Sequence, residues 1–295
     1  MDAMAKFSNE DYAFEYVKAK RWPNGVICPR CGTMEPSFVK SRKIWRCHGC
    51  KKQFSIRLGT IFEDSPIPLG KWLSGVWLMA NAKNGVSSCE VARSLEITQK
   101  SAWHLVHRIR LAMEAEPPFR LLEGTVEADE TFVGGKLDRR RHKAGRDKFG
   151  DWAHKTPVMG VLERGGEVRA MTIPRSSAPQ LTRTVRRHVS PGSNLYTDAH
   201  AGYYWLKTDY LHETVNHLDE WARGAVHTNN IECFWSLFKR SIRGTWVRPS
   251  RKHMDRYAVD QAFRWNLRET DDPGRFAELS GRVFDRRLTW QDLVR

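Results

Sequence analysis

The sequence predicts an α/β protein in which a mixed sheet with flanking helices follows a small metal-binding ribbon and a helical region. Three observations support this prediction: two Cys-x-x-Cys pairs near the N-terminus, helical periodicity over about 70–116, and short strand-like runs mixed with amphipathic helical patterns after about 120. We expect four segments, namely the N-terminal segment with the ribbon (1–66), the helical region (67–117), the α/β domain (118–268) and a C-terminal tail (269–295).

The composition of the 295-residue chain is strongly basic, with 49 Lys and Arg against 34 Asp and Glu and a net charge of +15. This excess favours polyanionic partners, nucleic acid first, although an anionic membrane surface fits the same charge. The sequence contains no apolar run of about 18 residues and no apolar core of a signal peptide near Met1. We therefore expect a soluble cytoplasmic protein with no membrane partner.

The first motif consists of CPRCG and CHGC, separated by 15 residues and containing Cys28, Cys31, Cys47 and Cys50. Four thiolates at this spacing are typical of a tetrahedral Zn²⁺ site, and four ligands leave no position open for catalysis. The zinc would therefore be structural, with strands between and after the pairs. Two disulfides are the alternative, but they are uncommon in proteins without a secretory signal. Cys89 and Cys233 are expected to be buried or partly buried thiols.

The helical region is expected to form three helices. An apolar helix runs to Gly85. Ser87 and Glu90 have the spacing of a capping box for a short helix, and Thr98 is the predicted N-cap of a longer basic helix. A short helix, a tight turn and a basic helix form the helix-turn-helix pattern, whose second helix can enter a DNA major groove. An ordinary helical linker fits the same pattern. The candidate DNA contacts on the basic helix are Lys100, His104 and Arg108.

The α/β region begins with three predicted strands and continues with strands that alternate with helices, which is the ribonuclease-H-like order. The strands are expected within 124–135, 156–163, 167–174, 193–203 and 212–217, and the helices at 177–189, from about 229, and at about 251–268.

Three acids in this region are candidates for metal binding: Asp129 in the first strand, Asp198 at the end of the fourth, and Glu232 at the start of a helix. If the fold brings them together, they could hold two divalent cations about 3.5–4 Å apart that activate one oxygen and stabilise another. Carboxylates suit Mg²⁺ or Mn²⁺. Strand alternation places Glu127 with Asp129 on one face and Glu130 on the other.

Each candidate acid also has a structural interpretation. Asp198 can begin a turn, and Asn229 with Glu232 has the spacing of a capping box. On the predicted helix Glu232 shares a face with Lys239 and Arg243, which favours a metal ligand with phosphate contacts behind it. The apolar stripe of the same helix is predicted at Ile231, Trp235, Phe238 and Ile242.

The chain resembles the bacterial insertion-sequence transposases that combine a zinc ribbon with a DDE-type catalytic domain. The resemblance rests on CPRCG and CHGC with KKQFSIRLGTIFEDSPIPLGKW, and on ADETFVGGK, YTDAHAGY and HTNNIECFWSLFKR, in that order over about 15–268. It implies a DNA transposase whose catalytic acids are Asp129, Asp198 and Glu232. Some members carry Asn as the third ligand, so Asn229 or Asn230 competes with Glu232.

The resemblance also implies structural Zn²⁺, catalytic Mg²⁺ or Mn²⁺, double-stranded DNA as element ends and target, a nucleoid-associated location in a bacterium, and a homodimer or larger assembly on DNA. The segment 136–155 holds eight Lys or Arg against three Asp and is interpreted as a DNA-contacting insertion, with a solvated loop as the alternative. Its candidate contacts are Arg139, Arg140 and Arg141. A non-catalytic DNA-binding regulator and a structure-specific nuclease of the same fold are the rival functions.

Overall fold

The computed structural model describes residues 2–115, 120–134, 155–216 and 222–295. The chain forms two compact units, of which unit 1 combines residues 1–113 with 270–295 and unit 2 contains residues 114–269. Unit 2 ends at residue 269. The predicted C-terminal tail, however, packs as part of unit 1, so the chain leaves unit 1, builds unit 2 and returns.

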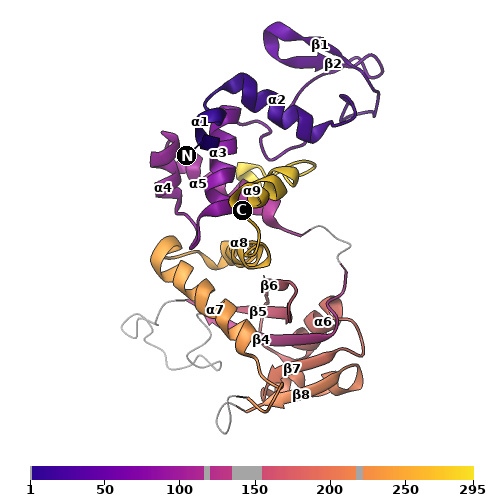
Figure 1. The fold of residues 1–295 in the computed structure, drawn as a ribbon, viewed down its shortest axis with the longest axis vertical. Coiled ribbons are helices and arrows are strands. Elements are labelled where there is room, and N and C mark those ends of the chain that lie inside the picture. Colours follow the sequence, from indigo (N-terminus) through magenta and orange to yellow (C-terminus); the bar gives the residue numbers. More distant parts are fainter. Residues whose placement is uncertain (1, 116–119, 135–154, 217–221) are drawn as a thin grey trace. The chain divides into compact units, whose positions relative to one another are not determined.

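Unit 1 contains a small antiparallel sheet of order β1-β2-β3 and a set of helices (Figure 1). Its elements are α1 (Asp2–Phe7), α2 (Glu10–Arg21), β1 (Ser37–Val39), the 3₁₀ turn η1 (Lys40–Arg42), β2 (Ile44–Arg46), β3 (Gln53–Ser55), α3 (Leu69–Asn81), α4 (Ser88–Leu95), α5 (Gln99–Met113), α9 (Asp272–Gly281) and α10 (Trp290–Val294).

The helix-turn-helix pattern is present as α4, a tight turn and α5. The Ser87 hydroxyl accepts a hydrogen bond from the Glu90 backbone N–H at 3.1 Å, and Thr98 Oγ1 accepts one from the Ser101 N–H at 3.2 Å. Ser87 and Thr98 therefore cap their helices as predicted, and of the predicted Ser87–Glu90 capping box the bond to the Ser87 side chain is present. The preceding helix ends at Asn81, before the predicted stop at Gly85, because Ala82 already has extended backbone angles.

The C-terminal segment joins unit 1 through apolar packing and backbone pairing. The Phe276 ring lies 5.1 Å from that of Phe7, and the Ile61 N–H donates to the Val283 carbonyl at 3.0 Å. Leu279 and Val283 are almost fully buried. Burial of these side chains stabilises unit 1 because apolar surface is removed from water.

Unit 2 is built on a five-stranded sheet of order β6-β5-β4-β7-β8. Strand β5 pairs antiparallel with β4 and with β6, while β7 is parallel to β4 and to β8. This mixed order is the predicted ribonuclease-H-like one. The elements are β4 (Thr125–Val133), β5 (Thr156–Glu163), β6 (Val168–Thr172), α6 (Ala178–His188), β7 (Asn194–Asp198), the 3₁₀ helix η3 (Ala201–Thr208), β8 (Leu211–Val215), α7 (Asn229–Ser241), the π-helical turn η4 (Ile242–Trp246), the 3₁₀ turn η5 (Arg251–His253) and α8 (Met254–Asn266).

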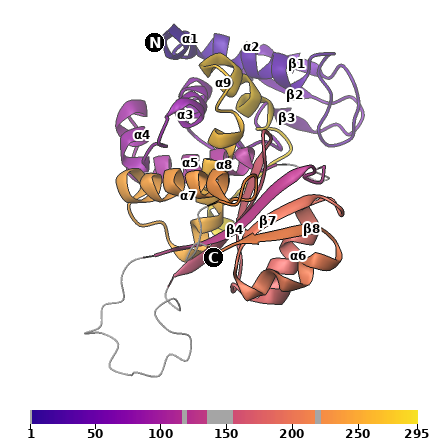
Figure 2. The same cartoon turned by 60° about the horizontal axis from the view of Figure 1, so that its bottom comes forward.

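Helices cover both faces of this sheet (Figure 2). One core joins α6 and η3 to side chains such as Val126 and Ala128 of β4. The opposite core joins α7 and α8 to β5 and β6, and it buries the predicted stripe of Ile231, Trp235 and Phe238. The faces of β4 therefore meet different helices, which determines where its acids point.

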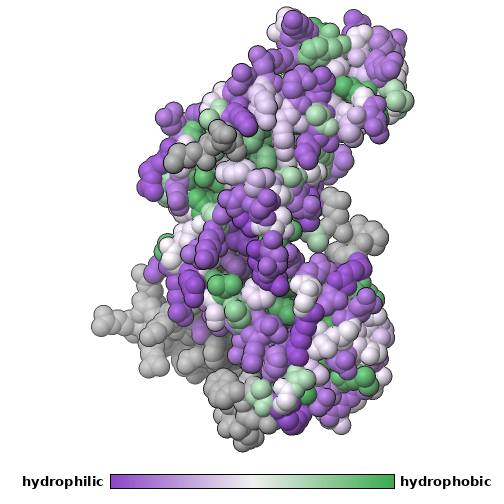
Figure 3. Space-filling view, viewed as in Figure 1, coloured by the Kyte–Doolittle hydropathy of each residue, from purple (hydrophilic) through white to green (hydrophobic). Residues whose placement is uncertain are grey.

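The surface of the described residues is mainly hydrophilic on the face that Figure 3 presents, with hydrophobic residues in small separate patches. None of the helices in the described ranges is long and apolar enough to cross a membrane.

Candidate active site

The acids of β4 lie on two faces of the sheet, as the strand alternation predicts. Asp129 contacts α7 and Glu130 contacts η3 on the other face. The neighbouring strand β7 runs parallel, with Thr197 paired to Ala128, and it ends at Asp198. The sheet therefore brings Asp198 next to Asp129 from a position about 70 residues away in the sequence.

Asp129 interacts with a hydrogen-bond donor on α7 and with the two other acids, Asp198 and Glu130. Its Oδ2 accepts a hydrogen bond from the indole Nε1–H of Trp235 at 2.9 Å. Removal from water, followed by the negative charges of Asp198 and Glu130, raises the pKa of the Asp129 carboxyl to about 7. Carboxyl groups that repel one another in this way offer the hard oxygen ligands of a divalent cation, whose charge would relieve the repulsion. The donor chemistry at Asp129 and Asp198 therefore fits Mg²⁺ or Mn²⁺.

Glu130 lies in a polar network on the other face of the sheet. Its carboxylate accepts hydrogen bonds from Ser176 Oγ at 2.7 Å and from the hydroxyl of Tyr203, which is fully buried. His200 Nδ1 lies 3.8 Å from Glu130 Oε1, and the His200 backbone N–H donates to Asp198 Oδ1 at 3.1 Å. These contacts connect Glu130 with the loop that follows Asp198.

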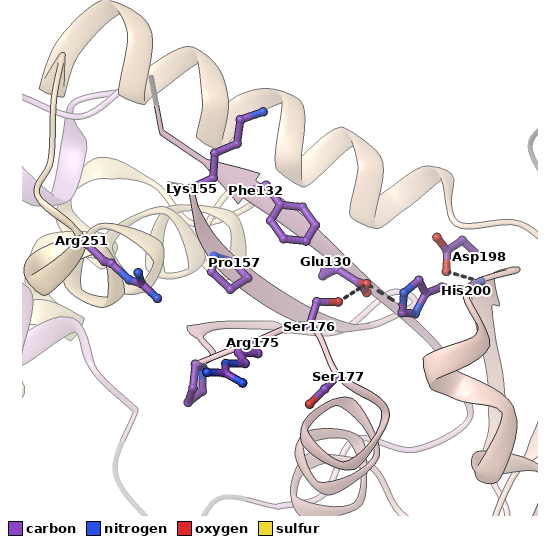
Figure 4. Close-up of a pocket in the computed structure, with 11 residues that line it drawn as sticks. Glu130, Phe132, Lys155, Pro157, Arg175, Ser176, Ser177, Asp198, His200 and Arg251 are labelled. Carbon is purple, nitrogen blue, oxygen red and sulfur yellow. Dashed lines mark hydrogen bonds and ion pairs between the residues drawn. The ribbon is translucent and has the colours of Figure 1, made fainter. Parts of the chain in front are cut away.

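A cavity of about 830 Å³ opens beside these residues. Glu130 and Asp198 line it together with Lys155, Arg175 and Arg251 (Figure 4). In Figure 4 the acids lie toward one end and Arg251 lies toward the other. Anionic and cationic side chains thus share one cavity, an arrangement that can accept a phosphodiester chain with metal ions at the acidic end.

Glu232 lies in the first turn of α7, and its Oε1 accepts a hydrogen bond from Thr228 Oγ1 at 2.9 Å. Among the described residues, only the four cysteines of unit 1 bring three or more ligand atoms within 4.8 Å of one another. The structure therefore does not gather Asp129, Asp198 and Glu232 at metal-binding distances. Of the three, it brings the two aspartates together.

The predicted capping box of Asn229 and Glu232 is not present. Helix α7 begins at Asn229, so the cap position is Thr228, and Glu232 bonds to the Thr228 side chain instead. The first turn is capped by a distant residue, since Glu127 Oε2 accepts from the backbone N–H groups of Asn230 and Ile231, each at 3.0 Å. Glu127 is fully buried, and a carboxylate at a helix N-terminus is favoured by the helix dipole.

The same carboxylate binds Arg164, which follows β5. Glu127 Oε1 accepts from Arg164 Nε at 2.7 Å, and the Arg164 guanidinium also donates to the carbonyl groups of Ala225 and His227, each at 2.8 Å. Glu127 thus ties β4, the end of β5 and the start of α7 to one another. From the sequence, Glu127 was placed only on a strand face and Trp235 only in the apolar stripe of its helix. The contacts that join β4 to α7 span more than 100 residues, and no local pattern indicates them.

The predicted DNA-contacting residues differ in exposure. Lys239 and Arg243 are exposed along α7 and η4 and line a surface hollow, and Lys100 is exposed, with its Nζ 4.9 Å from the centre of the Trp290 ring. His104 is only partly exposed. Arg108 is 4% exposed and its guanidinium donates to the Glu63 carbonyl, so it is a core residue and does not present its charge to a partner. Arg139, Arg140 and Arg141 lie outside the described residues.

The four ribbon cysteines form the metal-binding cluster predicted for unit 1. Their sulfur atoms lie within 4.8 Å of one another, with 3.8 Å between Cys28 and Cys50 and 3.4 Å between Cys31 and Cys47. Zn–S bonds of about 2.3 Å in a tetrahedron place the sulfur atoms about 3.8 Å apart. The donor set and its spacing therefore fit zinc.

The cysteines outside the ribbon do not follow the expectation. Cys89 and Cys233 are both exposed rather than buried, because each occupies the outer side of its helix.

Two family descriptions match parts of this chain. Residues 121–266 match the family described as the ISXO2-like transposase domain, and residues 8–53 match the transposase zinc-ribbon domain. A Halobacterium salinarum protein described as an uncharacterized protein in the transposable element ISH50 is 28% identical over 83% of this chain and 85% of its own length. The crystal structure of the Mos1 strand transfer complex is 12% identical, with 70% of this chain and 73% of that chain covered at a TM-score of 0.27.

Proposed function

Because this chain belongs to the family of insertion-sequence transposases that combine a zinc ribbon with a DDE-type, ISXO2-like transposase domain, we propose that it cuts DNA at the ends of its element and joins the exposed 3′ ends to target DNA. One observation carries the proposal for the active site. Asp129 and Asp198 lie on adjacent parallel strands, and removal from water, followed by the negative charges of Asp198 and Glu130, raises the pKa of the Asp129 carboxyl to about 7.

In this proposal Asp129 and Asp198 hold divalent cations, Mg²⁺ or Mn²⁺, with Glu232 as the third ligand. Such cations, when bound, activate the attacking oxygen and stabilise the leaving oxygen. Water first attacks the phosphorus at an element end and releases a 3′-hydroxyl. That hydroxyl then attacks a phosphodiester of the target in a second in-line displacement. Glu130 is the competing third acid, since it lines the cavity with Asp198.

Binding of double-stranded DNA is assigned to the exposed cations. Lys239 and Arg243 follow Glu232 on α7 and η4, and Lys100 lies on the second helix of the helix-turn-helix pattern. Phosphate contacts of this kind provide affinity without reading sequence. The ribbon, with structural Zn²⁺ on its four cysteines, and the helix-turn-helix pattern would recognise the terminal repeats. The active assembly would be a homodimer or larger complex that holds two ends, and its place is the bacterial cytoplasm at the nucleoid.

A plasmid that carries the gene with its natural flanking DNA tests the proposal, with Mg²⁺ and three proteins: wild type, Glu232→Gln and Glu130→Gln. End-specific cuts and joined products from wild type and Glu130→Gln, but not from Glu232→Gln, are the expected result. Loss of products only in Glu130→Gln would make Glu130 the third acid. Cutting without joining by the wild type would favour a nuclease, and binding without cutting by the wild type would favour a regulator.

A further inference from the structure

The buried side chain of Trp235 contacts Asp129 of the proposed active site. Its indole is 3% exposed, and its Nε1–H donates to Asp129 Oδ2 at 2.9 Å. Trp235 lies one helical turn after Glu232 on α7. A fully packed aromatic ring whose only polar atom reaches an active-site acid differs from an ordinary core tryptophan, because that ring can fix the orientation of the carboxylate.

The sheet provides the space that this ring occupies. Gly160 of β5 pairs with Asp129 across the antiparallel ladder. A Cβ atom at Gly160 would lie 2.8 Å from Trp235 Cζ2, closer than such atoms approach one another, and 3.0 Å from Ile231 Cδ1, which is tighter than most such contacts. The glycine thus lets the Trp235 ring lie directly over the strand position next to Asp129.

Two contacts hold α7 in register with β4. Glu127 binds the backbone N–H groups of the first turn, and Trp235 binds Asp129 about one turn later. Glu127 and Asp129 are alternate residues on the same face of β4. Their two contacts therefore occur in the same order along β4 as along α7. The helix that carries Glu232 is thereby fixed relative to the strand that carries Asp129.

We infer that Trp235 is a positioning residue that orients the Asp129 carboxylate for a divalent cation, and that Gly160 provides the space for it. The inference rests on the proposed role of Asp129 as a metal ligand. An indole N–H is only a donor, so it bonds best to the ionised carboxylate. A carboxylate has lone pairs on both oxygens, and it can therefore keep this hydrogen bond while it binds a cation. Loss of such an orienting partner typically lowers metal affinity about 10- to 100-fold.

Binding of Mn²⁺ by the full-length, zinc-loaded protein without DNA tests this inference. Free Mn²⁺ is counted from its electron paramagnetic resonance signal for wild type, Trp235→Phe, Trp265→Phe and Asp198→Asn. Trp265 is the matched control, because it packs against Phe234 in the same core. We expect a dissociation constant for Mn²⁺ at least about 10-fold higher for Trp235→Phe, an unchanged one for Trp265→Phe, and no binding at this site by Asp198→Asn. Melting curves of both tryptophan variants separate metal affinity from folding.

Three outcomes would overturn the inference. Equal Mn²⁺ affinity of Trp235→Phe and wild type, with binding lost in Asp198→Asn, rejects the role of Trp235 and leaves the proposed metal site intact. An equal loss of affinity in Trp265→Phe and Trp235→Phe assigns the effect to core packing. Wild-type affinity in Asp198→Asn rejects the metal site itself, and the inference with it.

A measurement on the unaltered side chain covers the case in which Trp235→Phe does not fold. With ¹⁵N-labelled tryptophan, we expect one of the 12 indole N–H resonances to move on titration with Mg²⁺, and Asp129→Asn to abolish that response. The absence of any indole resonance that responds to Mg²⁺ would overturn the inference.

Discussion

Glu127 in the middle of β4 caps the first turn of α7 by accepting the backbone N–H of Ile231 at 3.0 Å, although 103 residues lie between them in the chain. The carboxylate is fully buried and also pairs with Arg164 Nε at 2.7 Å. Its charge is therefore balanced by a guanidinium, by the positive end of a helix and by backbone donors. Removal of that charge leaves the donors without an equivalent acceptor.

Glu127→Gln is expected to destabilise unit 2 by about 3–5 kcal/mol, because it breaks a buried pair and leaves the Arg164 charge uncompensated. Urea unfolding of wild type and variant measures the difference. Glu213→Gln is the control, since its pair with Arg223 is exposed on both sides and should contribute less than about 1 kcal/mol. Equal losses in the two variants would contradict a special role for Glu127.

Gly160→Ala is expected to cost about 1–3 kcal/mol in the free energy of unfolding, because the new methyl group overlaps the Trp235 ring and Ile231. The same variant should lower cleavage activity more than this loss of stability explains, since the ring also positions Asp129. Gly244→Ala is the control for stability, as an added Cβ there meets no atom within 4 Å. If Gly160→Ala unfolds like wild type, the ring can move aside without cost.

Local sequence patterns predict most of the helices and strands of unit 2, but they do not predict the contacts between these elements. Alternation predicts the two faces of β4, and the stripe of Ile231, Trp235 and Phe238 predicts the buried side of α7, because both patterns report which side of an element meets the core. The cap of α7 depends on Glu127, and no local pattern can show a partner so far along the chain. The proposed convergence of Glu232 with the aspartates stays a prediction, since family resemblance supports it and the described geometry does not gather the three acids.

The same limit explains the errors in unit 1. Arg108 lies on a basic helix, and charge alone predicted an exposed residue. The structure buries it beside Trp72, with its guanidinium 5.5 Å from the centre of that ring. Such burial requires knowledge of which core the helix packs against. The C-terminal segment was expected to form a tail for a related reason. Its apolar residues join a core that is formed by residues more than 150 positions earlier.

Removal of zinc is expected to unfold the ribbon, because the strands β1 to β3 are only three residues long and the four thiolates connect them. Metal analysis of the purified protein should give about one zinc per chain, and Cys47→Ser should lose it. Gly49→Ala should weaken zinc binding as well, since its Cβ would lie 2.2 Å from Thr33 Oγ1, which contacts Cys31 Sγ at 3.2 Å. Retention of zinc by Cys47→Ser would contradict a four-cysteine site.

Because His188 is buried, we expect the free energy of unfolding of unit 2 to depend on pH. Burial first, and then the charges of Arg169 and Arg187, lower the pKa of His188 to about 4. Between about pH 4 and 6.5 the unfolded chain binds the proton and the native chain does not, so this histidine makes stability rise with pH in that window and contributes little slope above it. His188→Asn should remove about 1–3 kcal/mol of that rise.

Urea unfolding of wild type and His188→Asn at several pH values from 4.5 to 7.5 measures the effect on unit 2. The comparison between the two proteins isolates His188, because Asp129, whose raised pKa acts with the opposite sign between its unfolded value and about 7, titrates in both. Parallel stability curves for the two proteins would mean that His188 does not titrate as its burial requires.

The exposed cations of α7 and η4 make a prediction about DNA affinity. Lys239 lies near the end of α7 and Arg243 lies in η4, which follows α7. Together they line one surface hollow. If each contacts a phosphate, the double variant Lys239→Ala with Arg243→Ala should reduce the slope of log binding constant against log salt by about 2, because two fewer counterions are released. Fluorescence anisotropy with labelled duplex DNA at several salt concentrations measures this slope.

Arg186→Ala with Lys207→Ala removes the same charge from exposed residues of α6 and η3 and should leave the slope unchanged if binding is local to α7. An equal change of slope in both double variants would assign the affinity to the overall charge of the protein and not to this surface.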